Sequence, residues 1–253
     1  MTLAYDASGT GPAVVLLHSG VCDRRMWDPQ VPALVGAGYR VVRCDFRGHG
    51  ETPVADRPYS DAADVAELLE HLGVERAAFV ASSYGGEVAL DVAATRPDSV
   101  TALALLCSAM PGHAPSAELR AFAEREGALF TADDLEGAVE LNVRTWVGPE
   151  ATDEARSQVR RMQRQAFELQ WTAEHSSTPR AELDLARITA PSLTVSGAHD
   201  LPDFQQIAQA LAAQLPAAHH MELPWAGHLP SLERPTETTA LLIRFLQQAS
   251  TGA

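Results

Sequence analysis

Two adjacent serines lie where the sequence predicts a turn between a strand and a helix. Ser82 and Ser83 follow residues 77–80, an apolar run of strand length, and precede residues 87–94, whose apolar members recur at helical spacing. A serine on such a tight turn projects above the end of its strand, where it can attack a carbonyl carbon. The first chemistry that the sequence indicates is therefore nucleophilic catalysis by serine.

The neighbours of the two serines favour Ser83 as the nucleophile. The turn requires small residues two positions before and two positions after the reactive serine, because backbone and helix crowd there. Ser83 has Ala81 and Gly85 at these positions, whereas Ser82 would have the bulky Tyr84 at the second one. Taken alone, the segment is also compatible with a purely structural turn.

A reactive serine needs a base that accepts its proton, and His228 is the best-placed histidine. It follows the last predicted strand in a loop between Pro224 and Pro230, directly after Gly227. In an open α/β sheet, reactive side chains lie on loops after the carboxyl ends of strands. His228 has that position, although a loop histidine by itself is more often structural.

The acid that orients the histidine is predicted after a strand between Ser83 and His228. Residues 192–196 form such a strand, and Asp200 follows in the next loop, with Asp203 as the alternative. The strand directly after the serine unit is not followed by a carboxylate, which favours Asp200. Turn aspartates are common, but the order serine, acid, histidine along the chain is that of a known hydrolase triad.

Alternating strands and helices surround these candidates and predict an α/β fold. Continuous apolar runs indicate strands buried on both faces, as in a parallel sheet covered by helices. We expect a mostly parallel central sheet with helices on both faces. The predicted strands are residues 3–5, 13–17, 39–44, 77–80, 100–106, 192–196 and 219–223. The predicted helices of this part are residues 26–34, residues 60–72 and the helix after Ser83 that stops at Pro97.

One stretch interrupts this alternation. Residues 113–180 contain no convincing strand, and three helices are predicted there, at residues 117–130, 132–146 and 153–171. We expect this segment to form a helical cap over the carboxyl edge of the sheet. The core then consists of residues 1–112 and 181–253.

Several motifs together resemble those of the α/β-hydrolase superfamily. The segment Leu16-Leu17-His18-Ser19-Gly20 resembles the loop after the family's third strand, with Ser19 in place of the usual glycine. Residues 45–50 resemble its D-x-R-G-x-G segment, and Gly227-His228 with Glu233 and Pro235 resembles its terminal histidine segment. The resemblance covers nearly the whole chain. Residues 21–27 and the helical cap are similar to the branch of small esterases and enol-lactone hydrolases.

The resemblance implies cleavage of a small carboxylic ester or lactone through an acyl-enzyme. It also implies that Gly20, or Val21 beside it, and Tyr84 supply the backbone amides of an oxyanion hole. The implied catalytic residues are Ser83, Asp200 and His228.

The substrate pocket is expected between cap and sheet, with mostly apolar walls that suit a small hydrophobic acyl group. Arg24, Arg25 and Arg144 are candidates to receive a substrate carboxylate. Each wall residue is also compatible with ordinary core packing. The candidate wall residues are Val21, Trp27, Tyr84, Met110, Trp146, Met162, Trp171, Leu201, Phe204 and Leu229.

The composition narrows the possible partners. The chain has 253 residues, of which 46% are hydrophobic and 21% charged, and its formal net charge is −14. Such an acidic protein is repelled by nucleic acid and by anionic membranes, so neither is expected as the main partner. The three cysteines are widely spaced and form no zinc-ligand pattern, so a reduced, cytoplasmic protein without metal or cofactor is expected. The expected partner is a small-molecule ester or lactone, and the oligomeric state is left open.

Other functions stay open on the same fold. The same triad can hydrolyse a thioester or cleave the C–C bond of a β-diketone. A non-hydrolytic ligand-binding protein can also keep the fold, because fold alone does not determine function.

Overall fold

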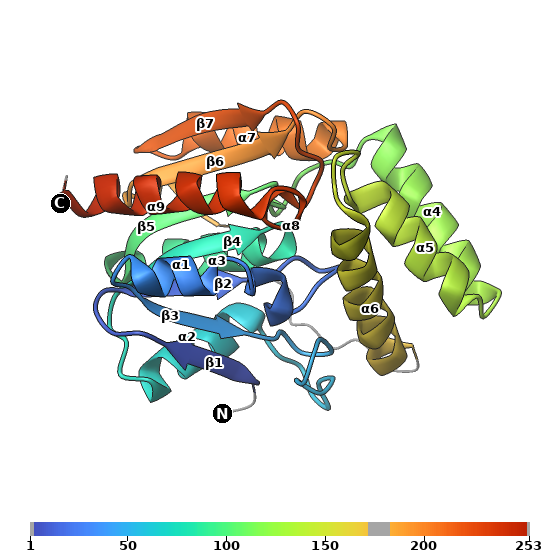
Figure 1. Ribbon diagram of the computed structural model, residues 1–253, viewed down its shortest axis with the longest axis horizontal. Helices are drawn as coiled ribbons and strands as arrows, with labels where there is room; N and C mark the ends of the chain where they lie inside the picture. The colour runs from blue at the N-terminus through green and yellow to red at the C-terminus, as the bar shows by residue number, and fades with distance from the viewer. Residues whose placement is uncertain (1–2, 172–182, 252–253) are drawn as a thin grey trace.

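The structure is a computed structural model that describes residues 3–171 and 183–251 (Figure 1). Its centre is a seven-stranded sheet in the spatial order β1-β3-β2-β4-β5-β6-β7. β1 is antiparallel to β3, and the other paired strands are parallel, so the prediction of a mostly parallel sheet is confirmed. The strands are β1 Tyr5–Ser8, β2 Ala13–Leu17, β3 Arg40–Cys44, β4 Ala77–Ser82, β5 Val100–Leu106, β6 Ser192–Gly197 and β7 Ala218–Leu223.

The two faces of the sheet carry separate apolar cores, because side chains alternate along each strand. In β2, for example, Val15 and Leu17 face one core and Val14 and Leu16 face the other. The predicted helices on both faces are confirmed, and α1 and α9 lie in front of the sheet in Figure 1. The first face carries α2 Asp61–His71, α3 Tyr84–Thr95 and α7 Pro202–Gln214, and the second carries α1 Val31–Gly36 and α9 Pro235–Thr251.

The chain between Arg24 and Gly36 forms two short helical segments instead of the single helix predicted for residues 26–34. Arg24–Trp27 is a 3₁₀ helix, and α1 begins only at Val31. Pro32 lies in the first turn of α1, where its missing N–H leaves no hydrogen bond unmade, whereas it would break one inside a longer helix. The first segment directs Met26 and Trp27 into the core.

Three helices follow β5 in the chain, namely α4 Ala117–Thr131, α5 Leu135–Trp146 and α6 Asp153–Gln170. Figure 1 shows them together beyond one end of the sheet. Ion pairs of Arg160 with Glu140 and of Arg164 with Glu136 join α6 to α5. The predicted end of the insertion, residue 180, lies outside the described residues, so its boundaries stay a prediction.

None of the helices in the described part of the chain has the length and apolar character needed to cross a membrane.

Candidate active site

The turn between β4 and α3 holds Ser83 in a backbone conformation that residues other than glycine rarely adopt. Ser83 has φ 53° and ψ −117°, and such strain is concentrated at functional sites. The small neighbour is required, because a Cβ on Gly85 would lie 2.6 Å from the carbonyl oxygens of Leu17 and His18. Ser82 is fully buried as the last residue of β4, whereas Ser83 keeps 9% of its surface exposed.

The structure brings together the three side chains that the sequence placed far apart. Ser83 Oγ lies 2.8 Å from His228 Nε2, and His228 Nδ1 lies 2.7 Å from Asp200 Oδ2. A carboxylate can only accept hydrogen bonds, so Nδ1–H of His228 donates to Asp200. Nε2 is then left to accept from the serine hydroxyl. Asp200 also accepts from the amide of Leu201 at 2.7 Å. This geometry matches a proton relay from serine to histidine with a fixed tautomer.

The loop that carries His228 is held by Glu233 on α8 Pro230–Glu233. Its Oε2 accepts from the amide of Gly227 at 2.7 Å and its Oε1 accepts from the amide of Leu229 at 2.9 Å. Gly148 is needed beside this loop, because its Cβ would lie 2.5 Å from the Gly227 nitrogen. These contacts fix the backbone on both sides of the imidazole.

Two aromatic rings enclose the imidazole of His228. The ring of Phe204 on α7 has its centroid 4.2 Å away, and that of Trp146 on α5 has its centroid 4.7 Å away. His228 is consequently only 2% exposed. The imidazole therefore lies in a nearly water-free environment, where electrostatic interactions are stronger than in water.

His18 organises the loop after β2. Its Nδ1–H donates to the carbonyl of Ser19 at 2.8 Å, and its Nε2 accepts from the amide of Phe46 at 2.9 Å. Burial, together with the nearby His49, lowers the pKa of His18 to about 3. A neutral, fully bonded imidazole of this kind is a structural element of the loop and not a second base.

The residues predicted for the oxyanion hole lie next to each other beside Ser83. A Cβ on Gly20 would lie 3.6 Å from the Cβ of Tyr84. Tyr84 is the first residue of α3, where backbone amides have no intrahelical acceptor. The Tyr84 hydroxyl points elsewhere and donates to Asp61 at 2.5 Å.

A cavity of about 290 Å³ opens above these groups, and it differs from the predicted pocket in its walls. Of the predicted wall residues, Val21, Trp146 and Phe204 line it, as does Gly20. The complete lining is Ser19, Gly20, Val21, Ser83, Leu119, Phe122, Glu126, Asn142, Trp146, Gln163, Phe167, Gln170, Phe204 and His228.

The other predicted wall residues lie elsewhere, for identifiable reasons. Trp27, Met162 and Leu229 are buried in the core on the α1 and α9 face. Trp171 packs on Phe130 and Phe167 and donates its Nε1–H to Asp133 at 2.8 Å. The residues Met110, Leu201 and Tyr84 pack against the core on the opposite face.

Polar cavity residues were missed by the sequence interpretation, which named only apolar and aromatic side chains as candidate walls. Their signal is their helical spacing with apolar lining residues, at intervals of three, four or seven positions. Glu126 shares a face with Leu119 and Phe122, and Asn142 shares one with Trp146. The third set is Gln163, Phe167 and Gln170 on α6.

The three arginines proposed as carboxylate receptors do not line the cavity. Arg24 pairs with Asp6, Asp45 and Glu51, and Arg25 pairs with Asp23. Arg144 is exposed on α5 and donates to the carbonyl of Glu140 at 3.2 Å. Acidic partners already neutralise the first two.

Asp203, the alternative acid, has a different task. Its Oδ1 accepts from His113 Nε2 at 2.9 Å and from the amide of Ser116 at 2.7 Å. Burial tends to raise its pKa, but these hydrogen bonds outweigh burial and lower it. Asp203 therefore ties the start of the helical insertion to α7 and does not contact His228.

Cys107 completes a group with Asp200 and His228 whose potential ligand atoms lie within 4.8 Å of one another, a possible metal site by distance alone. Burial raises the pKa of the Cys107 thiol well above its ordinary value, so the sulfur stays protonated and is a poor ligand. Asp200 and His228 already bond to each other. The chemistry of these groups therefore favours proton transfer over metal binding.

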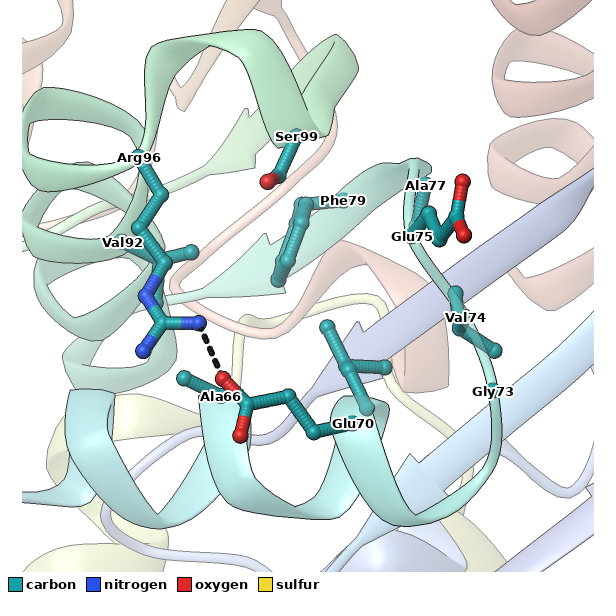
Figure 2. Close-up of a pocket in the computed structure, with 11 residues that line it drawn as sticks. Ala66, Glu70, Gly73, Val74, Glu75, Ala77, Phe79, Val92, Arg96 and Ser99 are labelled. Carbon is teal, nitrogen blue, oxygen red and sulfur yellow. Dashed lines mark hydrogen bonds and ion pairs between the residues drawn. The ribbon is translucent and has the colours of Figure 1, made fainter.

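A second cavity, of about 440 Å³, lies near the amino ends of β4 and β5 (Figure 2). Its floor is apolar and includes Phe79 and Val92. Figure 2 shows Arg96, the residue after α3, reaching toward Glu70 on α2, and these side chains form an ion pair of 2.6 Å. No histidine or cysteine is among the described residues that line it.

Comparisons with known proteins agree with this geometry. The model described as "Alpha/beta hydrolase family" matches residues 14–241. "Putative carbamate hydrolase RutD" from Variovorax paradoxus is 30% identical over 99% of this chain and 98% of its own length. "Putative non-heme bromoperoxidase BpoC" from Mycobacterium tuberculosis is 29% identical over 97% of each. The crystal structure of the enol-lactonase from Burkholderia xenovorans LB400 has a TM-score of 0.78 and 26% identity, covering 97% of this chain and 96% of that one. Because this family model matches most of its length, the chain belongs to the alpha/beta hydrolase family.

Proposed function

We propose that this protein is a serine hydrolase that cleaves a small carboxylic ester or lactone through an acyl-enzyme. The observation that carries the proposal is the continuous hydrogen-bond chain from Ser83 through His228 to Asp200, with distances of 2.8 and 2.7 Å. Membership of a hydrolase family supports hydrolysis. The likeness to an enol-lactonase supports the choice of an ester-type bond.

In the acylation step, Ser83 Oγ attacks the carbonyl carbon while His228 Nε2 accepts the hydroxyl proton. Asp200 stabilises the imidazolium that forms and keeps Nε2 directed at the serine. The tetrahedral intermediate then collapses, and His228 returns the proton to the leaving alcohol. In a lactone the leaving alcohol remains attached to the acyl group.

In the second step, water hydrolyses the acyl-enzyme. His228 takes a proton from water, the hydroxide adds to the acyl carbon, and Ser83 leaves with the proton from His228. The acid product and the free enzyme result. The same base thus serves both steps, which is why its fixed tautomer matters.

The backbone amides of Gly20 and Tyr84 are proposed to bind the oxyanion in both steps. Gly20 lies in the loop after β2 and Tyr84 is the first residue of α3, and these two segments meet beside Ser83. Losing one donor of this kind typically costs about 3 kcal/mol of transition-state stabilisation.

The test is burst kinetics with short-chain p-nitrophenyl esters and lactones, using wild type, Ser83→Ala and Ser82→Ala. Ser82 is the matched control, because it is adjacent, fully buried and has a hydroxyl without a hydrogen-bond partner in the described structure. We expect Ser83→Ala to lower kcat/KM by about 10⁴-fold or more and Ser82→Ala to retain most activity.

Carbamates, thioesters and β-diketones are included in the same assay. If only one of these were turned over, and Ser83→Ala again abolished the activity, the bond that the enzyme cleaves would be a different one and the proposed triad would stand. Equal activity of Ser83→Ala and wild type would refute the proposal, as would a wild type that is inactive on every ester and lactone.

A further inference from the structure

The wall of the catalytic cavity formed by α4, α5 and α6 is rich in hydrogen-bond acceptors. It carries one carboxylate and three carboxamides, those of Glu126, Asn142, Gln163 and Gln170. Among the described residues that line the cavity there is no lysine or arginine. A substrate carboxylate would therefore find no cation to neutralise it.

Two of the three carboxamides already have structural partners. Asn142 Nδ2 donates to Glu126 Oε1 at 2.6 Å, and Asn142 Oδ1 accepts from Trp146 Nε1 at 3.0 Å. Gln170 Nε2 donates to the carbonyl of Gly48 at 2.9 Å. These bonds hold the wall together and fix the orientation of Trp146 against His228.

Gln163 differs from these two residues. It is only 3% exposed, and its Oε1 has no hydrogen-bond partner in the described structure. Of the residues with such an unpaired buried atom, Gln163 lines the catalytic cavity, whereas Trp27, Gln30 and Ser231 do not. An unpaired buried amide oxygen is unfavourable, and a ligand that donates a hydrogen bond to it removes that penalty.

Glu126 adds an electrostatic preference to the same wall. Burial raises the pKa of its carboxyl, and the hydrogen bond from Asn142 partly opposes that rise. A second carboxylate in this cavity would repel the ionised form of Glu126 or force it to take up a proton. Either way, an anionic substrate binds less well than an uncharged one.

We propose that the catalytic cavity selects an uncharged ester or lactone that carries a hydroxyl or amide N–H group, which donates a hydrogen bond to Gln163 Oε1. Substrates with a carboxylate at that position are disfavoured. This proposal rests on the proposed hydrolase function and specifies the substrate class of the same site.

The test measures binding separately from turnover. The methyl esters of heptanoic and ω-hydroxyhexanoic acid and the monomethyl ester of pimelic acid have the same chain and end in a methyl, a hydroxyl and a carboxylate group. Calorimetric titration of Ser83→Ala, which retains the cavity but lacks the nucleophile, gives their Kd values. We expect the hydroxyl ligand to bind about tenfold more tightly than the methyl ligand, and the carboxylate ligand to bind more weakly than the hydroxyl one.

A Gln163→Met substitution in the same background removes the acceptor and keeps a side chain of similar length. We expect it to abolish the preference for hydroxyl over methyl and to leave the melting temperature equal or higher, since an unpaired buried oxygen is lost. Gln165→Met is the matched control on the same helix, because Gln165 donates to the carbonyl of Gly50 and does not line the cavity. The control should keep the preference.

Tighter or equal binding of the methyl ligand would overturn the proposal, as would binding of none of the three or an unchanged preference in Gln163→Met. The wild-type enzyme is assayed for turnover of the same esters. Selective binding without any turnover would support the substrate class and count against the proposed hydrolytic function, so the two failures are distinguishable.

Discussion

The two cavities lie at opposite ends of β4 and differ in what their walls can do. The larger one, about 440 Å³, lies where β4 begins and has an apolar floor with an exposed Glu70–Arg96 pair at its rim. The smaller one, about 290 Å³, lies where β4 ends and contains Ser83 and His228. The proposed nucleophile and its base thus line the smaller of these two cavities.

The difference follows from the direction of the strands. In a parallel sheet the loops that leave the carboxyl ends of several strands meet at one edge, so residues distant in sequence can converge there. Ser83 follows β4, Asp200 follows β6 and His228 follows β7. At the amino ends of β4 and β5, the chain enters the strand from a helix on one face of the sheet. In this protein, these ends contribute packing and a surface ion pair.

Among substitutions at the two ends of β4, the largest effect is expected from Asp200→Asn beside the smaller cavity. The asparagine cannot hold His228 in the tautomer that accepts from Ser83, so kcat should fall by about 10⁴-fold. Ester hydrolysis followed by stopped flow measures the change. Asp203→Asn is the control, because Asp203 bonds to His113 and Ser116 and should matter for stability more than for kcat. A loss of less than tenfold in Asp200→Asn would contradict the assigned role.

A smaller effect, on stability, is expected from His18 beside the catalytic cavity. Its pKa falls from 6.5 to about 3 on folding, so below about 6.5 the unfolded chain binds a proton that the folded chain does not. The contribution of His18 to the free energy of unfolding is fully present above that pH and is lost as the pH falls toward 3. Lowering the pH to about 5 should cost roughly 2 kcal/mol.

Urea unfolding of wild type and His18→Asn at about pH 7 and about pH 5 measures that cost. The variant should be less stable at the higher pH, because it loses the imidazole packing on Phe46. Its stability should then depend less on pH than that of the wild type. Identical pH dependence in the two proteins would show that His18 is not buried in its neutral form.

The smallest effect is expected from Arg96→Ala in the second cavity. Half of the Arg96 side chain is exposed, and surface ion pairs of this kind contribute about 0–1 kcal/mol. We expect kcat/KM to stay within about twofold of wild type. A large loss of activity would contradict the contrast between the two cavities, since it would mean that the larger one takes part in the reaction.

The sequence predicted the elements around the sheet well because their signals are local. The helix predicted at residues 60–72 corresponds to α2 Asp61–His71, and the side chain of Ser60 accepts from the amide of Ala63 at its start. Residues 26–34 were predicted poorly, because the apolar spacing there was compatible with one helix. Pro32 instead divides the stretch into a 3₁₀ helix and α1.

The cavity walls show the limit of such patterns. Trp27 was a candidate wall residue, whereas Gln163 was not considered as one. Trp27 is fully buried in the core, and Gln163 is 3% exposed and lines the same cavity as Ser83 and His228. Residue type predicts whether a side chain prefers burial but not which buried surface it reaches.

The amino-acid sequence was enough to nominate the candidate catalytic residues: a serine on a tight turn with small neighbours, and an acid and a histidine that follow later strands in hydrolase order. These features depend on neighbouring residues and on chain direction, which the sequence contains. The folded structure adds that the favoured Asp200 bonds to His228 whereas Asp203 bonds to His113. It also adds that Glu233 holds the histidine loop and that an acceptor-rich wall lines the cavity of Ser83. The first two contacts join loops that are distant in the sequence, which local patterns do not place in space. The cavity wall depends on how α4, α5 and α6 pack, and helical spacing defines a face of a helix without stating what that face will contact.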